Sequence, residues 1–253
     1  MENFCNDLWP LIYDQANHGR HEKELAFYAG ELLGEEGPVL DVACGTGMIL
    51  LPLLEKGVDI YGFDVSETML AVLYRKTRER GIRDVEKRVT CQNMVDFRYG
   101  QLFRAIAIPA RSFLHLVTQV EQIVCLRNIH AHLAEGGRLL LNFFTPRLDA
   151  LLKFTDPTPN YVQLNVFKHP VTGEDLEVSY RQVNDLNEQV QDIRWRFCSG
   201  GRVQETPMKI RWIYRNEFLL LAKLAGFDQT AVYGDFDKSA YKGEGEMVWV
   251  VEK

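Results

Sequence analysis

The chain has 253 residues, of which 46% are hydrophobic and 25% are charged, so it can bury a substantial core. These proportions exclude a disordered chain, a collagen and a disulfide-stapled miniprotein. The net charge of −6, from 29 basic and 35 acidic residues, argues against non-specific binding to nucleic acid, which requires a basic surface.

The cysteines and the first residues of the chain indicate whether to expect a metal site, a secreted protein or a membrane protein. The 5 cysteines are scattered and form no C-x-x-C pair, so neither a disulfide framework nor a zinc site is indicated, and no metal is expected. The start, MENFCNDLWPLIYDQ, lacks the basic and apolar regions of a secretory signal. No apolar run approaches the roughly 18 residues of a membrane span. We therefore expect a cytoplasmic protein with no membrane partner.

The first part of the chain alternates between strand and helix patterns. Short apolar runs predict buried strands at residues 38–42, 58–63, 85–90, 103–108 and 138–144. Helical spacing of apolar residues predicts helices at 47–55, 66–80 and 120–133. Ser66 is the expected N-cap of the second helix, Gly81 its stop, and the Gly136-Gly137 pair the stop of the third. This alternation predicts a parallel sheet with helices on both faces.

The pattern changes after about residue 151. Between residues 161 and 213, runs rich in β-branched and aromatic residues are separated by turns such as Ser199-Gly200-Gly201, which predicts an antiparallel sheet. Alternation along Arg194-Trp195-Arg196-Phe197 places the arginines and the aromatic rings on opposite faces, so one face is expected to be core. A helix at 216–225 and strands at 229–233 and 246–252 complete the chain.

The sharpest local feature is Asp41-Val-Ala-Cys-Gly45-Thr-Gly47, between the first predicted strand and the first helix. A Gly-x-Gly at such a junction lets the backbone approach a ligand and presents the amides of a helix N-terminus to it. The second strand ends near Asp64, and a carboxylate there can accept hydrogen bonds from both hydroxyls of a ribose. Together these features predict a nucleotide-containing ligand.

Two kinds of nucleotide compete for this site. A dinucleotide fingerprint continues as G-x-G-x-x-G, but the third position here is Leu50, so the glycine that permits close helix–strand packing is missing. Asp41 would also repel a pyrophosphate, whereas it suits a ligand with a cationic amino group. Both residues weaken the case for a nicotinamide cofactor.

The segments DVACGTG and YGFDVSETML resemble the cofactor-binding motifs of class I S-adenosylmethionine-dependent methyltransferases. The resemblance implies S-adenosylmethionine as cofactor and S-adenosylhomocysteine as product. It implies that Asp64 holds the ribose and that Val65 and Met69 flank the adenine or the ribose. The residues of the turn that it assigns to the methionine part are Asp41, Ala43, Gly45 and Gly47, with Cys44 in the same turn and Ala43 in place of the commoner glycine.

A third motif, Gln92-Asn-Met-Val-Asp-Phe97, is similar to the family's D-M-x-D-F. In the family the first acid usually receives the adenine amino group. Here Asn93 stands in its place, and its amide oxygen can accept the same hydrogen bond, although more weakly than a carboxylate. The resemblance therefore adds Asn93 and Met94 to the expected cofactor site.

The resemblance covers most of the chain outside residues 161–213. It implies a Rossmann-like, doubly wound α/β fold with a mostly parallel seven-stranded sheet and a small inserted antiparallel sheet. Tyr13-Asp14 and residues 24–28 are similar to helices that cover the cofactor in the family. We expect a cofactor-binding domain at 1–150 and 214–253, with its helical cover at 1–34 and an antiparallel lid at 151–213.

Three residues are candidates for catalysis. His115 lies near the carboxyl edge where open α/β sheets bind ligands, so it is either the proton acceptor for the substrate's nucleophile or a structural histidine with one hydrogen bond. Arg111 either holds the substrate or lies in solvent. Tyr13 either closes over the cofactor or packs the N-terminal helix.

We therefore expect an enzyme that moves a methyl group to nitrogen, oxygen or carbon of a small molecule by in-line displacement. The residues after the fourth strand, Ile108-Pro109-Ala110-Arg111, lack the Asn/Asp-Pro-Pro-aromatic run of the family's nucleobase and glutamine methyltransferases. A NAD-dependent oxidoreductase and a non-catalytic regulatory protein that binds S-adenosylmethionine stay open as alternatives. A monomer or a homodimer is expected.

Overall fold

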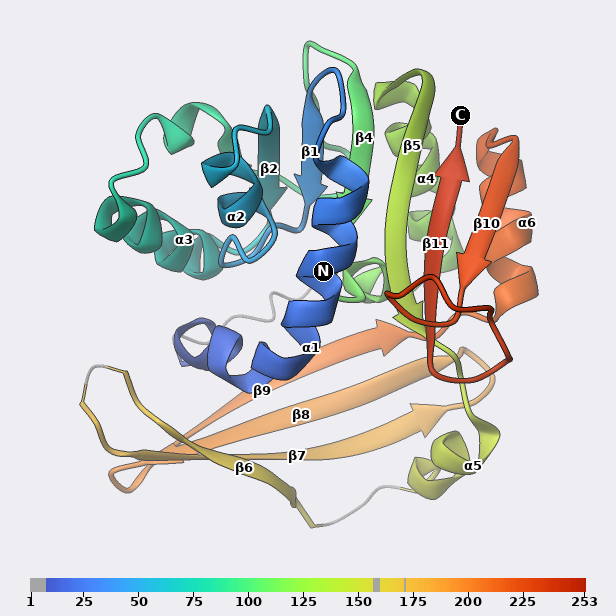
Figure 1. The fold of residues 1–253 in the computed structure, drawn as a ribbon. Helices are drawn as coiled ribbons and strands as arrows, with labels where there is room; N and C mark the ends of the chain where they lie inside the picture. Colours follow the sequence, from blue (N-terminus) through green and yellow to red (C-terminus); the bar gives the residue numbers. More distant parts are fainter. Residues whose placement is uncertain (1–7, 157–159, 171) are drawn as a thin grey trace.

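The computed structural model describes residues 8–156, 160–170 and 172–253, which form two β-sheets and the helices around them (Figure 1). The main sheet has the strand order β10-β11-β5-β4-β1-β2-β3. Strands β1 to β5 are parallel, whereas β11 is antiparallel to β5 and β10 is antiparallel to β11. These strands are β1 (Val39–Val42), β2 (Ile60–Asp64), β3 (Val89–Cys91), β4 (Phe103–Ile108), β5 (Leu133–Phe144), β10 (Gln229–Tyr233) and β11 (Glu246–Glu252).

The chain changes direction across the main sheet at β1. After β1 it adds β2 and β3 on one side, and then returns to add β4 and β5 on the other side. Open α/β sheets bind ligands beyond the carboxyl ends of the strands at such a switch point. The fold therefore places the ends of β1, β2 and β4 at the position where a ligand is expected.

Helices cover both faces of the main sheet (Figure 1). On one face, Tyr28, Leu50 and Leu70 from three helices join one buried cluster. On the other face, Leu126 and Phe218 from two helices join a second buried cluster. The helices of the first face are α1 (Trp9–Leu32), α2 (Leu50–Glu55) and α3 (Glu67–Arg80), and those of the second are α4 (Gln119–His132) and α6 (Arg215–Ala225).

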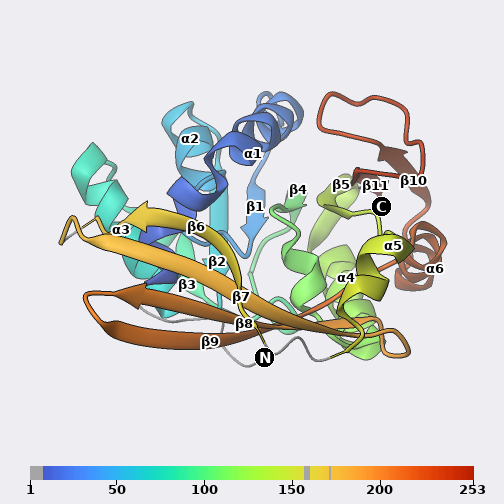
Figure 2. The same ribbon diagram turned by 90° about the horizontal axis from the view of Figure 1, so that it is seen from below.

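A second sheet is inserted between β5 and α6 and is antiparallel throughout, in the order β6-β7-β8-β9. Seen from below, it crosses the molecule beneath α1 (Figure 2). The ring of Trp9 on α1 stacks on Trp195 with centroids 5.4 Å apart, and Phe197 is fully buried in the same cluster. The second sheet consists of β6 (Val162–Lys168), β7 (Asp175–Asp185), β8 (Val190–Ser199) and β9 (Arg202–Arg211).

Most of the predicted architecture is confirmed. The fold class, the inserted antiparallel sheet and the bounds of β4, β10 and β11 agree with the structure. Ser66 caps α3 through a hydrogen bond from the amide of Met69, and Gly81 ends it in a left-handed conformation. The predicted separation of arginines from aromatic rings on β8 is also confirmed, because Trp195 and Phe197 pack towards α1.

Several predicted bounds are wrong, and the strand predicted at 138–144 begins already at Leu133. The first half of the strand predicted at 85–90 is a short 3-10 helix, η1 (Val85–Lys87), which follows the left-handed residue Asp84. The helix predicted from residue 47 begins at Leu50, because Gly45 and Gly47 have positive φ angles of 54° and 81°. The third helix ends at His132 rather than at the glycine pair, because Leu133 already pairs with β4.

Some features were not predicted or lie outside the described residues. The unpredicted elements are η2 (Ser112–His115), α5 (Leu148–Leu151) and η3 (Leu152–Phe154). Residues 1–7 of the expected cover, including Cys5, and residues 157–159 and 171 of the expected lid are outside the described ranges. Within those ranges no helix has the length and apolar character needed to cross a bilayer.

Candidate active site

The backbone of the turn between β1 and α2 adopts conformations that favour glycine. Ala43, Gly45 and Gly47 all have positive φ angles, of 58°, 54° and 81°. A Cβ atom on Gly47 would lie 2.8 Å from Leu51 and 3.0 Å from Leu73, so glycine is required there for packing as well as for conformation. The alanine at position 43 accepts a left-handed conformation that glycine adopts without strain.

Asp64 ties this turn to the end of β2. One carboxylate oxygen of Asp64 accepts a hydrogen bond from the amide of Gly45 at 2.9 Å, and the other accepts one from the amide of Ser66 at 2.8 Å. Burial raises the pKa of Asp64, and these amide hydrogen bonds oppose the rise. Each carboxylate oxygen has a second lone pair, so the group can still accept two hydroxyl hydrogen bonds from a ribose.

Asp41 lies on β1 directly before the turn and is only 1% exposed. Among the described residues, no side chain donates a hydrogen bond to either of its carboxylate oxygens. Burial raises the pKa of Asp41 well above its ordinary value, Asp64 and Glu24 raise it further, and the Leu50 amide opposes the rise. A buried carboxylate without a cation is costly, so this site is complementary to a ligand that brings a positive charge.

Further carboxylates surround Tyr28 on α1. Burial raises the pKa of the Tyr28 hydroxyl well above its ordinary value, and Glu24, Asp41 and Glu246 raise it further. Glu24 is fully buried and Glu246 is 8% exposed. The edge of the main sheet next to the glycine turn is therefore lined with buried acids, with Arg111 as the cation that contacts Glu246.

The residues predicted to contact adenine follow the ends of β2 and β3. The backbone amide of Gln92 donates to the carbonyl of Asp64 at 3.1 Å, which brings the third motif beside the second. The side-chain oxygen of Asn93 accepts a hydrogen bond from the amide of Val95 at 3.0 Å, so one of its two lone pairs is already used. Met69 and Met94 are buried nearby, and Val65 is half-buried.

Cys44 is buried within the turn, where its amide donates to the carbonyl of Phe63 at 2.9 Å. Burial raises the pKa of the Cys44 thiol well above its ordinary value, as do Asp41 and Asp64. The thiol is therefore protonated at neutral pH and is a poor nucleophile. Its compact side chain also lies close to β2, since a Cβ atom on Gly62 would be 3.2 Å from the sulfur.

Helix α1 holds the turn from the other side. The hydroxyl of Thr46 donates to Asp14 at 2.6 Å, and Asp14 also forms an ion pair with Lys76 of α3. Lys76 in turn donates to the carbonyl of Thr46 at 2.9 Å. The neighbouring Tyr13 is half-buried and makes an edge contact with Trp9, with centroids 5.8 Å apart. Sequence reasoning placed Tyr13 on the cover but missed the contact made by Asp14.

The two other catalytic candidates follow β4. His115 ends η2, and burial lowers the pKa of its ring, while a hydrogen bond to the backbone of Lys209 on β9 opposes that shift. Arg111 forms two hydrogen bonds with Glu246, from Nε at 3.1 Å and from Nη2 at 2.7 Å. The structure thus places His115 where the segment after β4 contacts the second sheet. It places Arg111 beside the first residue of β11.

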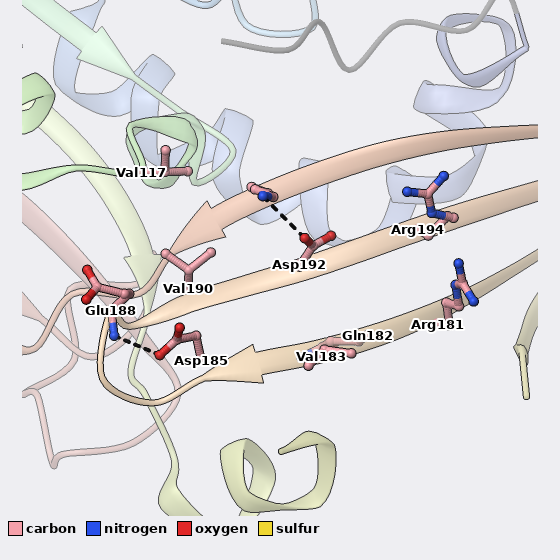
Figure 3. Close-up of a pocket in the computed structure, with 10 residues that line it drawn as sticks. Val117, Arg181, Gln182, Val183, Asp185, Glu188, Val190, Asp192 and Arg194 are labelled. Carbon is pink, nitrogen blue, oxygen red and sulfur yellow. Dashed lines mark hydrogen bonds and ion pairs between the residues drawn. The ribbon is translucent and has the colours of Figure 1, made fainter. Parts of the chain in front are cut away.

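A separate pocket of about 730 Å³ lies on the second sheet and reaches Val117 (Figure 3). Arg181, Arg194 and Asp192 line it, on the sheet face opposite to Trp195. Its charged groups pair with one another in part, since Lys209 contacts Asp192 at 3.3 Å. Because Trp195 packs on α1, this pocket faces away from the glycine turn. Within the described ranges no group of three His, Cys, Asp or Glu side chains has the arrangement of a metal site.

Comparison with known proteins identifies the enzyme class. A family model described as a methyltransferase domain matches residues 39–137, which include the turn, Asp64 and the third motif. A glycine/sarcosine N-methyltransferase of Parasynechococcus marenigrum (strain WH8102) is 29% identical over 261 residues, which cover 100% of this chain and 84% of that protein. Residues 39–137 therefore match a methyltransferase domain, and the predicted S-adenosylmethionine-dependent methyltransferase is confirmed.

The methyltransferase has further relatives in sequence and in fold. A dTDP-3-amino-3,6-dideoxy-alpha-D-glucopyranose N,N-dimethyltransferase of Streptomyces fradiae is 30% identical over 133 residues, which cover 52% of this chain and 49% of that protein. The solved structure of the CcbJ methyltransferase from Streptomyces caelestis has the same fold, with a TM-score of 0.77 and 22% identity over 99% of this chain and 98% of that one.

These comparisons confirm the predicted enzyme class and cofactor, and neither the oxidoreductase nor the non-catalytic regulator receives support. The residues present fit the cofactor, because S-adenosylmethionine carries positive charge and Asp41 is a buried acid without a cation. Sequence reasoning missed Glu24, Asn142 and Glu246. Glu24 gave a faint signal as an acid in a segment expected to cover the cofactor, whereas Glu246 looked only like the start of a strand.

Replacing Asp41 by asparagine should stabilise the ligand-free methyltransferase at pH 7 by at least about 1 kcal/mol, because it removes a buried ionisable group that has no cationic partner. The pKa of Asp41 is raised in the folded state, so its favourable contribution is present at low pH and is lost as the pH rises through the folded pKa. The gain of Asp41→Asn should therefore shrink as the pH falls towards 4, near the ordinary aspartate pKa.

Urea unfolding at pH 7 and pH 4.5, with and without saturating S-adenosylmethionine, measures this effect. With the cofactor bound, the order of the two free energies of unfolding should reverse, so that the wild type is more stable than Asp41→Asn. An Asp41→Asn variant that is less stable than the wild type without ligand at pH 7 would contradict the assignment of Asp41 as an uncompensated charge.

Proposed function

We propose that the methyltransferase methylates a primary or secondary amine of a small molecule. The buried acidic lining of Glu24, Asp41 and Asp64 carries this proposal, because it attracts an amine and repels an anionic nucleophile. Two relatives support it by name: one is an N-methyltransferase of glycine and sarcosine, and the other is an N,N-dimethyltransferase of a dTDP-linked amino sugar.

The cofactor supplies a methyl group made reactive by a positively charged sulfur. The tasks left to the protein are therefore to bind, to orient the acceptor in line and to exclude water. In this proposal the turn binds the methionine part of the cofactor, Asp64 binds the ribose, and the ends of β2 and β3 bind the adenine. The residues assigned are Asp41, Ala43, Cys44, Gly45 and Gly47 to the first part and Asp64 to the second. Val65 and Met69 are assigned to the adenine or the ribose, and Asn93 and Met94 to the adenine side.

Helix α1 and the second sheet have the role of cover in this proposal. The Trp9–Trp195 stack joins them, and the Asp14–Thr46 hydrogen bond joins α1 to the cofactor turn. We assign residues 1–150 and 214–253 to a cofactor-binding domain, with 1–34 as its cover, and 151–213 to a lid. Tyr13 lies on the part of α1 that contacts both the turn and the second sheet, which supports its assignment as a residue that closes over the site.

The acceptor amine must be neutral to attack, so an ammonium substrate has to lose a proton first. His115 is our candidate acceptor of that proton, because burial lowers its pKa and keeps the ring neutral near pH 7. A neutral ring has one N–H and one lone-pair nitrogen, and the backbone of Lys209 fixes the orientation of the ring. Arg111 is assigned to the acceptor side of the site beside His115.

Methyl-labelled S-adenosylmethionine with a panel of acceptors tests the proposed function. The panel pairs amines (glycine, sarcosine and a dTDP-linked amino sugar) with a phenol and an amine-free sugar as matched controls. We expect mass spectrometry to place the label on nitrogen of at least one amine and on neither control. Label on oxygen or carbon alone, or no labelled product from any amine, would contradict the proposal.

Substituting His115 by glutamine should lower kcat for the preferred amine by about 10²- to 10⁴-fold, the usual contribution of a positioned base. The affinity for S-adenosylmethionine should stay within about twofold, because His115 is assigned to the acceptor and not to the cofactor. His130→Gln, on α4 beside Phe227, is the control for loss of a histidine elsewhere. If His115→Gln keeps kcat within about threefold of the wild type, the base assignment is wrong.

A further inference from the structure

A chain of hydrogen bonds joins four separate elements at the acceptor side of the site. The hydroxyl of Tyr28 on α1 donates to the side-chain oxygen of Asn142 on β5 at 2.9 Å. The amide nitrogen of Asn142 donates to Glu246 at the start of β11, also at 2.9 Å. Glu246 then receives both hydrogen bonds of Arg111, in the loop after β4. We call Tyr28, Asn142, Glu246 and Arg111 the Glu246 network.

The loop held by this network, residues 109–111, has a strained backbone. Ala110 and Arg111 are consecutive non-glycine residues with φ angles of 56° and 64°. A left-handed conformation costs about 1–2 kcal/mol for each residue that carries a Cβ atom, so two in succession persist only when surrounding contacts enforce them. Such strain is concentrated at functional sites in folded proteins.

Two separate contacts hold the 109–111 loop. The amide of Ala110 donates to the carboxylate of Glu24 on α1 at 2.5 Å, and Glu24 is fully buried. In the second contact, the Arg111 guanidinium is bound by Glu246 and lies over the ring of Phe144, 5.4 Å from its centroid. Because Tyr28 lies one helical turn after Glu24, the same face of α1 supports both contacts.

The position of the 109–111 loop links it to the reaction. In the main sheet Ala107 of β4 pairs with Asp41 of β1, so the loop starts two residues beyond the partner of the cofactor-site acid. Glu246 pairs with Phe144 at the matching end of β5. The loop therefore lies at the carboxyl edge beside the cofactor turn, on the side away from Asp64 and the adenine residues.

We infer that Glu246 is a positioning residue that fixes Arg111 and the 109–111 loop in the geometry needed to receive the methyl acceptor. The carboxylate accepts three hydrogen bonds and is largely buried, so its part is to hold Arg111 rather than to exchange protons with solvent. Asn142 and Tyr28 extend this support to α1, so that the cover helix and the acceptor loop are held by one set of contacts. As far as it concerns the acceptor, the inference rests on the proposed function.

The test compares Glu246→Gln with Asp149→Asn. Arg147 and Asp149 form a two-bond ion pair with the same N···O distances of 3.1 and 2.7 Å, but it is exposed and lies outside the network, so Asp149→Asn is a matched control. Glu246→Gln should lower kcat/KM for the preferred amine by about 10- to 100-fold, the usual cost of misplacing a reactant. Its dissociation constant for S-adenosylmethionine should stay within about twofold, and Asp149→Asn should match the wild type in both.

Two measurements separate positioning from a general loss of structure. In a double-mutant cycle with Arg111→Gln, the double variant should lose about as much kcat/KM as the worse single variant, because both act through one contact. Additive losses, or an equal fall in cofactor affinity and melting temperature, would overturn the inference. So would a Glu246→Gln variant with the kinetics of Asp149→Asn.

Hydrogen exchange followed by mass spectrometry tests the same inference without an acceptor. Peptides that contain the 109–111 loop should take up deuterium at least about tenfold faster in Glu246→Gln than in Asp149→Asn. The reason is that the strained loop loses one of the two contacts that support it, the ion pair of Arg111. Unchanged exchange would overturn the inference even if methyl transfer to amines fails. Conversely, a wild type inactive on every amine together with faster exchange in Glu246→Gln would count against the proposed function alone.

Discussion

A buried negative charge without a cation is the constraint on which the rest of the active site depends. Asp41 lies near the end of β1 and is almost inaccessible, and no side chain in the described part of the chain donates a hydrogen bond to its oxygens. A site of this kind is costly to fold and becomes favourable when a positively charged ligand enters. The glycine turn beside it provides the space, and Asp64 provides a second acceptor that the turn itself orients.

The two covering elements are arranged around that constraint. Helix α1 contacts the turn through Asp14, the acceptor loop through Glu24, and the second sheet through Trp9. A single helix therefore links the cofactor turn, the acceptor loop and the second sheet. In the proposed function, this arrangement serves to exclude water from a reaction in which the methyl donor is already reactive and positioning supplies most of the remaining catalysis.

The sequence predicted best what depends on local pattern. The order of strand, glycine turn, helix and acidic strand end lies within about 25 residues, and each part has a conformational or chemical reason that is visible in the residues themselves. The contacts between Arg111 and Glu246 or between Asp14 and Thr46 join residues 135 and 32 positions apart, so no periodicity reports them. The start of η1 was missed for another reason, since Asp84 adopts a left-handed conformation that local propensity does not favour.

Calorimetry of cofactor binding tests the central claim most directly. The wild type should bind S-adenosylhomocysteine and S-adenosylmethionine and should give no binding heat with NADH. An Asp64→Ala variant should bind both adenosyl ligands at least about tenfold more weakly, since it loses charge-assisted hydrogen bonds to the ribose, while Asp84→Ala, an exposed acid paired with Lys87, should bind them as the wild type does. Binding heat with NADH alone, or unchanged affinity in Asp64→Ala, would contradict the account.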